Sequence, residues 1–480
     1  MQKPTLAAFF FTAAAVLLVV IIIIPVVVVK KDKDAGSSSA LRGPIGTETP
    51  SLASPSGSES YLAVLDFLRA TLPEYLQEEL EQGDVDSPQL QAAQWLADHD
   101  NLTEVLSLDL SDSHQQILQR YSLATFYFAL GGDEWDFCGG KVHCNGIRAP
   151  WLSAVDECNW AFIRCNDQGL ITQINWHAEV WNGEHLIPGF KNNMVGTVPQ
   201  EVSLLTSLEV FVLTENSVGV DLDRVFQNTT SMVRLWASGN VLDGTFPVQL
   251  LQNNPNLREV NLAGNWDLHG PVLGVAGHPS LQELILDDTS VDGTLQDMIM
   301  VDNTTSIYQA NLRVLRLNNT QVSGTIPSAI SQLTKLSVLD LGSTNLDGPL
   351  PKELFYLTDL SLLVVGNVGL SGTIPDAVAN LTHLSELDLS FNAFEGTVPE
   401  EIEALNFTLM DLFLNNNEFT GSVPVAFNFL TALETLTIQN NDLTGSISAA
   451  VCAERGLRYQ QLATLVVPCQ VECKCCDKCE

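Results

Sequence analysis

The most constraining feature of this sequence is a 24-residue repeat that occurs several times between about residues 312 and 447. Two consecutive copies read LSVLDLGSTNLDGPLPKELFYLTD and LSLLVVGNVGLSGTIPDAVANLTH. Successive copies start 24 or 25 residues apart, at Leu312, Leu336, Leu360, Leu384, Leu409 and Leu433. A fixed period of this length indicates a solenoid, in which each coil packs only against its neighbours.

The role of each recurring position within one repeat can be explained by simple physics. The segment LxxLxL is a short strand whose alternate side chains point the same way, so its leucines enter a shared core. The polar residue after it (Asn392, Asn417 and Asn441 in three copies) turns the chain, and its amide can satisfy backbone groups of the adjacent coil. A glycine and a proline then make a bend, and a short helical segment on the convex side returns the chain. Because one coil cannot bury its apolar face alone, the coils must stack.

Weaker copies extend the pattern toward the N-terminus. They open at Leu208, Met232, Leu257 and Leu281, and a first strand lies at residues 170–176. This gives about eleven coils over residues 170–451, with the LxxLxLxxN signature of leucine-rich repeats. The expected fold class is therefore an α/β solenoid: a right-handed leucine-rich-repeat horseshoe with a parallel sheet on its concave side.

Three coils carry threonine where the turn asparagine is expected. They are the coils that contain Thr289, Thr320 and Thr344. A hydroxyl can make part of the hydrogen bonding of the asparagine amide, so we expect these coils to persist.

The charge of the chain limits its partners. The net charge is −35, with only 22 lysines and arginines against 57 acidic residues. Such a balance argues against nucleic acid as a partner. The acidic residues are spread along the chain, which is typical of a soluble surface.

Residues 7–29 are uncharged and nearly all strongly apolar. This run is long enough to cross a bilayer, and it is longer than the apolar core of most signal peptides. We therefore favour an uncleaved single-pass membrane anchor within residues 1–34 over a cleaved signal. Lys30, Lys31 and Lys33 follow the run and would place the repeats in the cytoplasm by the positive-inside rule. Residues 35–60 are rich in Gly, Ser and Pro and are expected to form a flexible stalk.

Residues 61–169 are expected to cap the open end of the solenoid. Apolar residues recur at helical spacing in three segments, 61–82, 87–100 and 112–130. Four cysteines follow the third segment. We prefer a helical and cysteine-containing cap to a separate active domain, because the terminal coil of a solenoid needs a cover.

The text WLSAVDECNWAFIRCNDQGLITQINW, from Trp151, resembles the N-terminal cap of plant-type extracellular leucine-rich-repeat proteins. Phe162 departs from the family pattern, which usually has glycine there. The preceding RYSLATFYFALGGDEW is similar to a lead-in of the leucine-rich-repeat families of heterokont algae. The resemblance implies a receptor-like recognition module without a kinase domain, facing the cell exterior or the secretory-pathway lumen, with a co-receptor as a further partner. The matching residues are Cys158, Trp160, Ile163, Cys165 and Gly169.

The ten cysteines lie only at the two ends of the solenoid. One interpretation is that disulfides tie both caps in an oxidising compartment, and the other is a metal site, since Cys476 and Cys479 have ligand-like spacing. We favour disulfides, with Cys158–Cys165 as the most local pair; the connectivity of the last six does not follow from spacing. The cysteines are Cys138, Cys144, Cys158 and Cys165 in the first cap and Cys452, Cys469, Cys473, Cys475, Cys476 and Cys479 in a second cap of residues 452–480.

Six N-glycosylation sequons favour the same secretory compartment. They also conflict with the lysines that follow residues 7–29, and we give the cysteines and sequons more weight. One sequon is on the concave face, where a glycan would block part of the groove. The acceptor residues are Asn101, Asn228, Asn303, Asn318, Asn380 and Asn406.

No catalytic motif is present: the sequence lacks GxxxxGK[ST], HExxH and GxSxG. We therefore expect no enzyme activity, no cofactor and no metal. The expected function is binding of a protein, peptide or glycan ligand by the strand residues that point outward on the concave face. Two alternatives are a structural or adhesive cell-coat protein and a hydrolase-inhibitor-like binding protein.

Candidate ligand-binding residues are the charged and aromatic ones among these outward positions, because Trp and Arg are favoured at binding hot spots. An exposed Trp236 beside Arg234 and Arg258 is the best single patch. A basic strip continues from it, and an acidic strip with two nearby phenylalanines lies beyond. The remaining candidates are Arg313 and Arg316 in the basic strip, Asp340, Glu386, Asp388 and Asp411 in the acidic strip, and Phe391 and Phe413.

Overall fold

The computed structural model describes residues 59–82, 84, 86–99, 111–138, 148–176, 180–181, 186–187, 192–273, 275–299, 311–448, 451 and 462–479. The expected anchor (7–29), nearly all of the expected stalk (35–60) and the sequons at Asn101 and Asn303 lie outside these ranges. Within them, no helix has both the length and the apolar character needed to cross a membrane.

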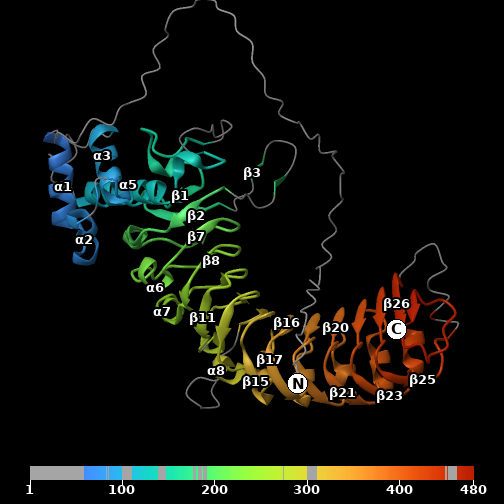
Figure 1. Ribbon diagram of the computed structural model, residues 1–480. Coiled ribbons are helices and arrows are strands. Elements are labelled where there is room, and N and C mark those ends of the chain that lie inside the picture. The colour runs from blue at the N-terminus through green and yellow to red at the C-terminus, as the bar shows by residue number, and fades with distance from the viewer. Residues whose placement is uncertain are drawn as a thin grey trace, which may run out of the picture. The chain divides into compact units, whose positions relative to one another are not determined.

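Short strands stack in chain order into one 14-stranded sheet (Figure 1). All neighbours pair in parallel except the first two, β1 (Ile163–Cys165) and β2 (Ile171–Asn175). In most strands the middle residue is buried and its two neighbours are half-buried, as the LxxLxL pattern predicts. This confirms the leucine-rich-repeat solenoid. The other strands are β6 (Val210–Val212), β8 (Arg234–Trp236), β10 (Glu259–Asn261), β12 (Glu283–Ile285), β14 (Val314–Arg316), β16 (Val338–Asp340), β18 (Leu362–Val364), β20 (Glu386–Asp388), β22 (Asp411–Phe413), β24 (Thr435–Thr437), β26 (Thr464–Val467) and β27 (Lys478–Cys479).

A second line of parallel strands follows the turn of each coil. One group comprises β15 (Ser323–Thr325), β17 (Asn345–Pro349), β19 (Leu370–Gly372), β21 (Ala393–Gly396), β23 (Glu418–Ser422) and β25 (Asp442–Thr444). Earlier coils contribute β5 (Val195–Thr197) with β7 (Ser217–Gly219), and β9 (Gly244–Thr245) with β11 (Leu268–Pro271) and β13 (Ser290–Asp292). The hairpin of β3 (Val180–Trp181) and β4 (Leu186–Ile187) lies in an insertion of the first coil.

The return segments are mostly single turns of 3₁₀ helix. Seven of them begin directly after the proline of the repeat, which fixes φ and has no N–H to lose at a helix start. These are η3 (Gln200–Leu204), α7 (Val248–Asn253), η5 (Ser328–Gln332), η6 (Lys352–Tyr356), η7 (Asp376–Asn380), η8 (Glu400–Leu405) and η9 (Val425–Phe429). The other coils use α6 (Leu222–Val225), η4 (Val275–Gly277) and α8 (Leu295–Ile299).

The turn residues hold successive coils together. The Asn240 amide donates to the Leu213 carbonyl of the previous coil at 2.6 Å, and its oxygen accepts from the Val218 N–H at 3.1 Å. Where threonine replaces asparagine, the hydroxyl donates only within its own coil, as from Thr320 to the Leu317 carbonyl at 2.8 Å. Thr289 and Thr344 do the same, so the expectation that these coils persist is confirmed.

Among the described residues, four α-helices precede the sheet: α1 (Glu59–Thr71), α2 (Glu74–Gln82), α3 (Pro88–His99) and α5 (Ser111–Ala129). The single helix expected at residues 61–82 is wrong, because the chain breaks between α1 and α2. Pro73 explains the break, since it lacks an N–H and its ring disfavours a helical conformation at the preceding residue. Figure 1 shows α5 beside β1, at the end of the sheet.

An arginine of α5 connects these helices to the cysteine cap. The Arg120 guanidinium lies over the rings of both Trp95 on α3 and Trp160 in the cap, 5.5 and 5.4 Å from their centroids. Its Nη1 also pairs with the buried Glu157 carboxylate at 3.1 Å, beside η2 (Glu157–Asn159). These contacts hold the helices against the first coils.

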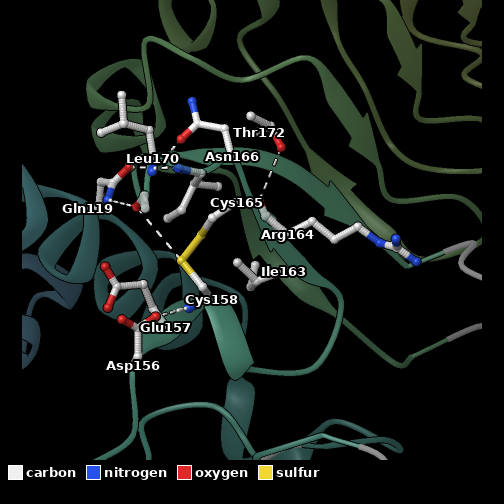
Figure 2. The surroundings of a disulfide bond; sticks show 12 residues. Gln119, Asp156, Glu157, Cys158, Ile163, Arg164, Cys165, Asn166, Leu170 and Thr172 are labelled. Atoms are coloured by element: carbon white, nitrogen blue, oxygen red, sulfur yellow. Dashed lines mark hydrogen bonds between the residues drawn. A yellow bond between two sulfur atoms is a disulfide. The ribbon is translucent and has the colours of Figure 1, made fainter.

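The first cap contains the expected disulfide between Cys158 and Cys165 (Figure 2). Next to it, the Gln119 side chain of α5 donates to the Gly169 carbonyl at 3.1 Å and accepts from the Ile171 N–H at 2.8 Å, so it pairs with the backbone of β2 like an extra strand. Phe162, which stands at the family's usual glycine, has φ 67°, the left-handed conformation that glycine adopts easily. The turn therefore keeps its shape despite the departure from the pattern.

The second cap extends the sheet through β26 and β27. Cys473 and Cys476 form a disulfide, which removes the Cys476 sulfur from any metal site with Cys479. Cys138 and Cys475 are also disulfide-bonded. Cys144 and Cys452 lie outside the described residues, and the pairing of Cys469 and Cys479 stays a prediction.

Candidate ligand-binding face

The outward residues of the strands form aligned columns across the sheet. The first and third residues of each strand point away from the core, and the register places Arg234, Glu259 and Glu283 side by side. Further along, Glu386 faces Asp411, and Asp388 faces Phe413. Neighbouring strands are about 4.8 Å apart, so each side chain contacts its counterparts in the adjacent coils.

Arg234, at the centre of the patch around Trp236, already has partners within the protein. The Arg234 guanidinium bonds the Glu259 carboxylate, with Nη2 2.9 Å from Oε1, and it lies 4.6 Å from the centre of the Trp236 ring. The hydrogen bond to Glu259 raises the pKa of Arg234. Trp236 is half-buried rather than exposed, contrary to the sequence-based expectation, because the neighbouring arginine stacks on its face. Arg258 beside it is exposed.

Arg316 is likewise neutralised by its neighbours. Its Nε lies 2.7 Å from Asp287 and its Nη2 lies 3.2 Å from Asp340. Burial raises the pKa of Asp287, and Arg316 partly offsets that effect. The expected basic strip is therefore wrong at Arg316, whose charge is compensated by two carboxylates, while Arg313 remains an exposed cation.

Asn318 belongs to the same network. Its side-chain amide donates to Asp340 at 3.0 Å, and its backbone N–H donates to Asp287 at 2.9 Å. The residue is half-buried on the concave face. The other described sequons differ: Asn228 and Asn380 are exposed, and Asn406 is half-buried directly after η8.

The face of β20 and β22 has no ion pair of this kind. Within the described part of the chain, Glu386, Asp388 and Asp411 form none. Burial, and then the charges of Asp411, Asp388 and Asp340, raise the pKa of Glu386, and the more distant charge of Arg316 opposes the shift. Burial also raises the pKa of Asp388, although hydrogen bonds from Ser390 oppose the shift. These carboxylates repel one another on a half-buried surface.

Phe391 is an outlier of the same region. It has φ 55° and its side chain is 56% exposed. A left-handed conformation is costly for a bulky residue, and exposure gives the ring little compensating burial. In other coils this position holds glycine or a polar residue: Glu215, Gly239, Gly264, Asp288, Asn319, Ser343, Asn367, Asn416 and Asn440.

Two exposed apolar residues that we did not select from the sequence precede β22 in the same coil. Phe407 is 80% exposed and Met410, directly before β22, is 44% exposed. The signal was available, because the coil that contains Phe407 is one residue longer than its neighbours. Such an insertion displaces a side chain from the shared core. The structure thus gathers Asp388, Phe391 and Phe413 in one region with them, and leaves Trp236 and Arg234 in another.

Comparison with known families supports the observed fold. A leucine-rich-repeat family model matches residues 311–333 and 383–405. The chain thus contains leucine-rich repeats and has their solenoid fold. No curated protein sequence matches this leucine-rich-repeat protein.

Several solved structures are similar to this chain. The Arabidopsis receptor kinase HAESA, in complex with the peptide hormone IDA and the co-receptor SERK1, is 27% identical over 65% of this chain and 50% of that one, with a TM-score of 0.53. A TDR receptor is 28% identical over 55% of this chain and 44% of that one, with a TM-score of 0.48. A plant ice-binding protein is 18% identical over 75% and 96%, with a TM-score of 0.45. This leucine-rich-repeat protein thus spans half or less of the first two structures.

Proposed function

We propose that this leucine-rich-repeat protein is a membrane-tethered recognition protein that binds a peptide through its concave face and catalyses no reaction. The likeness to HAESA, a receptor kinase solved with a peptide hormone and a co-receptor, supports a peptide ligand and a co-receptor as partners. The sequence alone leaves a protein, a peptide or a glycan as the ligand, and we choose the peptide because of this likeness.

The tethering and location are part of the same proposal. Residues 7–29 would anchor the chain, with the repeats in the extracellular space or the secretory-pathway lumen. The disulfides, among them Cys158–Cys165 and Cys473–Cys476, support an oxidising compartment. The sequons at Asn228 and Asn380 are both exposed, and we expect glycans there, most readily at Asn380, because the Asn228 amide also donates to the Tyr75 hydroxyl at 2.8 Å.

The observation that carries the proposal is the concentration of unfavourable features at β20 and β22. Unpaired, half-buried carboxylates and an exposed aromatic residue in a left-handed conformation each lower stability. Natural proteins keep such features mainly at functional sites, where a partner supplies the missing interactions.

The test uses the whole chain as bait for a display library of random-sequence peptides. Selected peptides should lose about tenfold or more in affinity when Phe413 is replaced by alanine, because an aromatic side chain at the centre of an interface is a common hot spot. The matched control is Tyr356→Ala on η6, an aromatic residue that is 54% exposed outside the concave sheet. Peptides that respond to Tyr356→Ala and ignore Phe413→Ala, or the absence of any selected peptide, would contradict the proposal.

A further inference from the structure

We infer that the ligand is a cationic peptide, which places arginine or lysine side chains on the carboxylates of β20 and β22 and apolar side chains on the adjacent phenylalanines. This inference rests on the proposed function, namely that the concave face binds a ligand, and adds the chemical class of that ligand.

The first argument is charge complementarity on one sheet face. Glu386 and Asp411 are register partners on adjacent strands, and Asp388 lies two residues along β20. No described arginine, lysine or histidine forms an ion pair with any of the three. Elsewhere on the same face, Glu259 is paired with Arg234 and Asp340 with Arg316. The protein itself therefore shows that a guanidinium fits a carboxylate in this setting.

The second argument is the position of the apolar side chains. Phe391 lies past the C-terminal end of β20, and Met410 lies at the N-terminal end of β22. The carboxylates are therefore bordered by apolar groups at both edges of the strand face, with the half-buried Phe413 beside Asp388. A peptide that carries both basic and apolar side chains would use all of these groups, whereas a small inorganic cation would contact only the carboxylates.

The third argument concerns access. The sequon at Asn318 is the described one on this face, and its amide nitrogen donates to Asp340 within a half-buried network. Attachment of a glycan would use that nitrogen and disturb the network. We therefore expect Asn318 to be unmodified and the approach to β20 and β22 to remain open.

The experiment compares two synthetic peptides on the full-length protein. One alternates arginine with leucine and phenylalanine, and the other replaces each arginine by citrulline, which has nearly the same shape and no charge. The arginine peptide should bind about tenfold or more tightly, because each buried charge pair contributes at least about 1.5 kcal/mol in favourable cases.

The control variants separate a local site from general attraction to a chain of net charge −35. The triple variant E386Q/D388N/D411N should lose most of the preference for arginine over citrulline. The matched triple variant D376N/E401Q/E403Q removes the same charge from exposed residues on η7 and η8 and should change the affinity less than about twofold, since exposed charges are screened by salt. Both variants should melt cooperatively, because neither removes a salt bridge of the described residues.

Equal binding of the two peptides, or an equal loss from both triple variants, would overturn the inference. The proposed function would survive that result if library-selected peptides without basic residues still respond to Phe413→Ala. If no peptide loses affinity on Phe413→Ala, both the inference and the proposed function are wrong.

Discussion

The two halves of the concave face solve the same structural problem differently. From β8 to β16, Arg234 and Arg316 neutralise Glu259, Asp287 and Asp340. At β20 and β22, Glu386, Asp388 and Asp411 occupy equivalent outward positions without an ion pair among the described residues, and the charge of Arg316 acts on Glu386 without contact. Because the coils share one backbone geometry, the difference lies in the side chains alone. In the first half, ion pairs with arginine offset part of the cost of burying the carboxylates, and in the second half no ion pair does so.

The pKa shifts express this contrast only in part, because burial also raises the pKa of Asp287 and Glu283 in the first half, where the charges of nearby arginines oppose the shift. A carboxyl group whose pKa rises on folding binds protons more readily in the native state, so its ionised form opposes folding at neutral pH. This applies to Glu386 and Asp388. A face that carries such a cost without an internal partner is where an external partner has most to offer.

Removing Arg316 should give the largest change in the comparison. Replacement by methionine leaves Asp287 and Asp340 without a cation, and Asp340 is only 5% exposed. We expect a loss of about 2 kcal/mol in the free energy of unfolding, below the value for a fully buried pair because the Arg316 side chain is 37% exposed. Urea denaturation measures it.

The control for Arg316→Met is Arg313→Met in the same coil. Arg313 is exposed and has no described ion pair, so its replacement should change stability by less than about 0.5 kcal/mol. Equal losses from the two variants would show that the Asp287–Arg316–Asp340 network contributes nothing specific.

The fold was predictable from sequence because its determinants repeat. The period of 24 residues fixes which leucines share the core, and the turn residues could be read coil by coil. The compensation of Arg316 was not predictable in the same way. Its partner Asp287 is 29 residues earlier, across a coil of irregular length, and only the register of the built sheet brings the two together. Likewise, the burial of Trp236 depends on the orientation chosen by Arg234.

Two glutamates at the same position of their strands should respond with opposite sign. Glu259→Gln removes the partner of Arg234 and should lower stability by about 1 kcal/mol, given the partial exposure of the pair. Glu386→Gln removes repulsion from Asp388 and Asp411 and should raise stability by about 0.5 kcal/mol. Thermal and urea unfolding of both variants at neutral pH measure the effects. A loss of stability from both would remove the distinction between the two halves.

The stability advantage of the triple variant E386Q/D388N/D411N should depend on pH. In the wild type, the folded pKa of Glu386 and Asp388 is raised above the unfolded value. Their favourable contribution is therefore fully present below the unfolded pKa, about 4, and is lost as pH rises through the folded pKa. The variant should exceed the wild type in stability at pH 7 and converge with it near pH 4. An advantage that grows toward acid pH would contradict the assigned direction.

Phe391 gives the smallest expected effect on stability and separates binding from folding. Phe391→Asn places there the residue found at the same left-handed position in the flanking coils, Asn367 and Asn416. Relief of the backbone strain should raise stability by about 0.5 kcal/mol, because asparagine tolerates this conformation better than an aromatic residue. The reverse change, Asn367→Phe, should lower stability by a similar amount. If Phe391→Asn stabilises the protein and also weakens the arginine peptide, then the strain at Phe391 serves the ligand. If peptide affinity is unchanged, Phe391 is only a tolerated irregularity, and the site is confined to the carboxylates and Phe413.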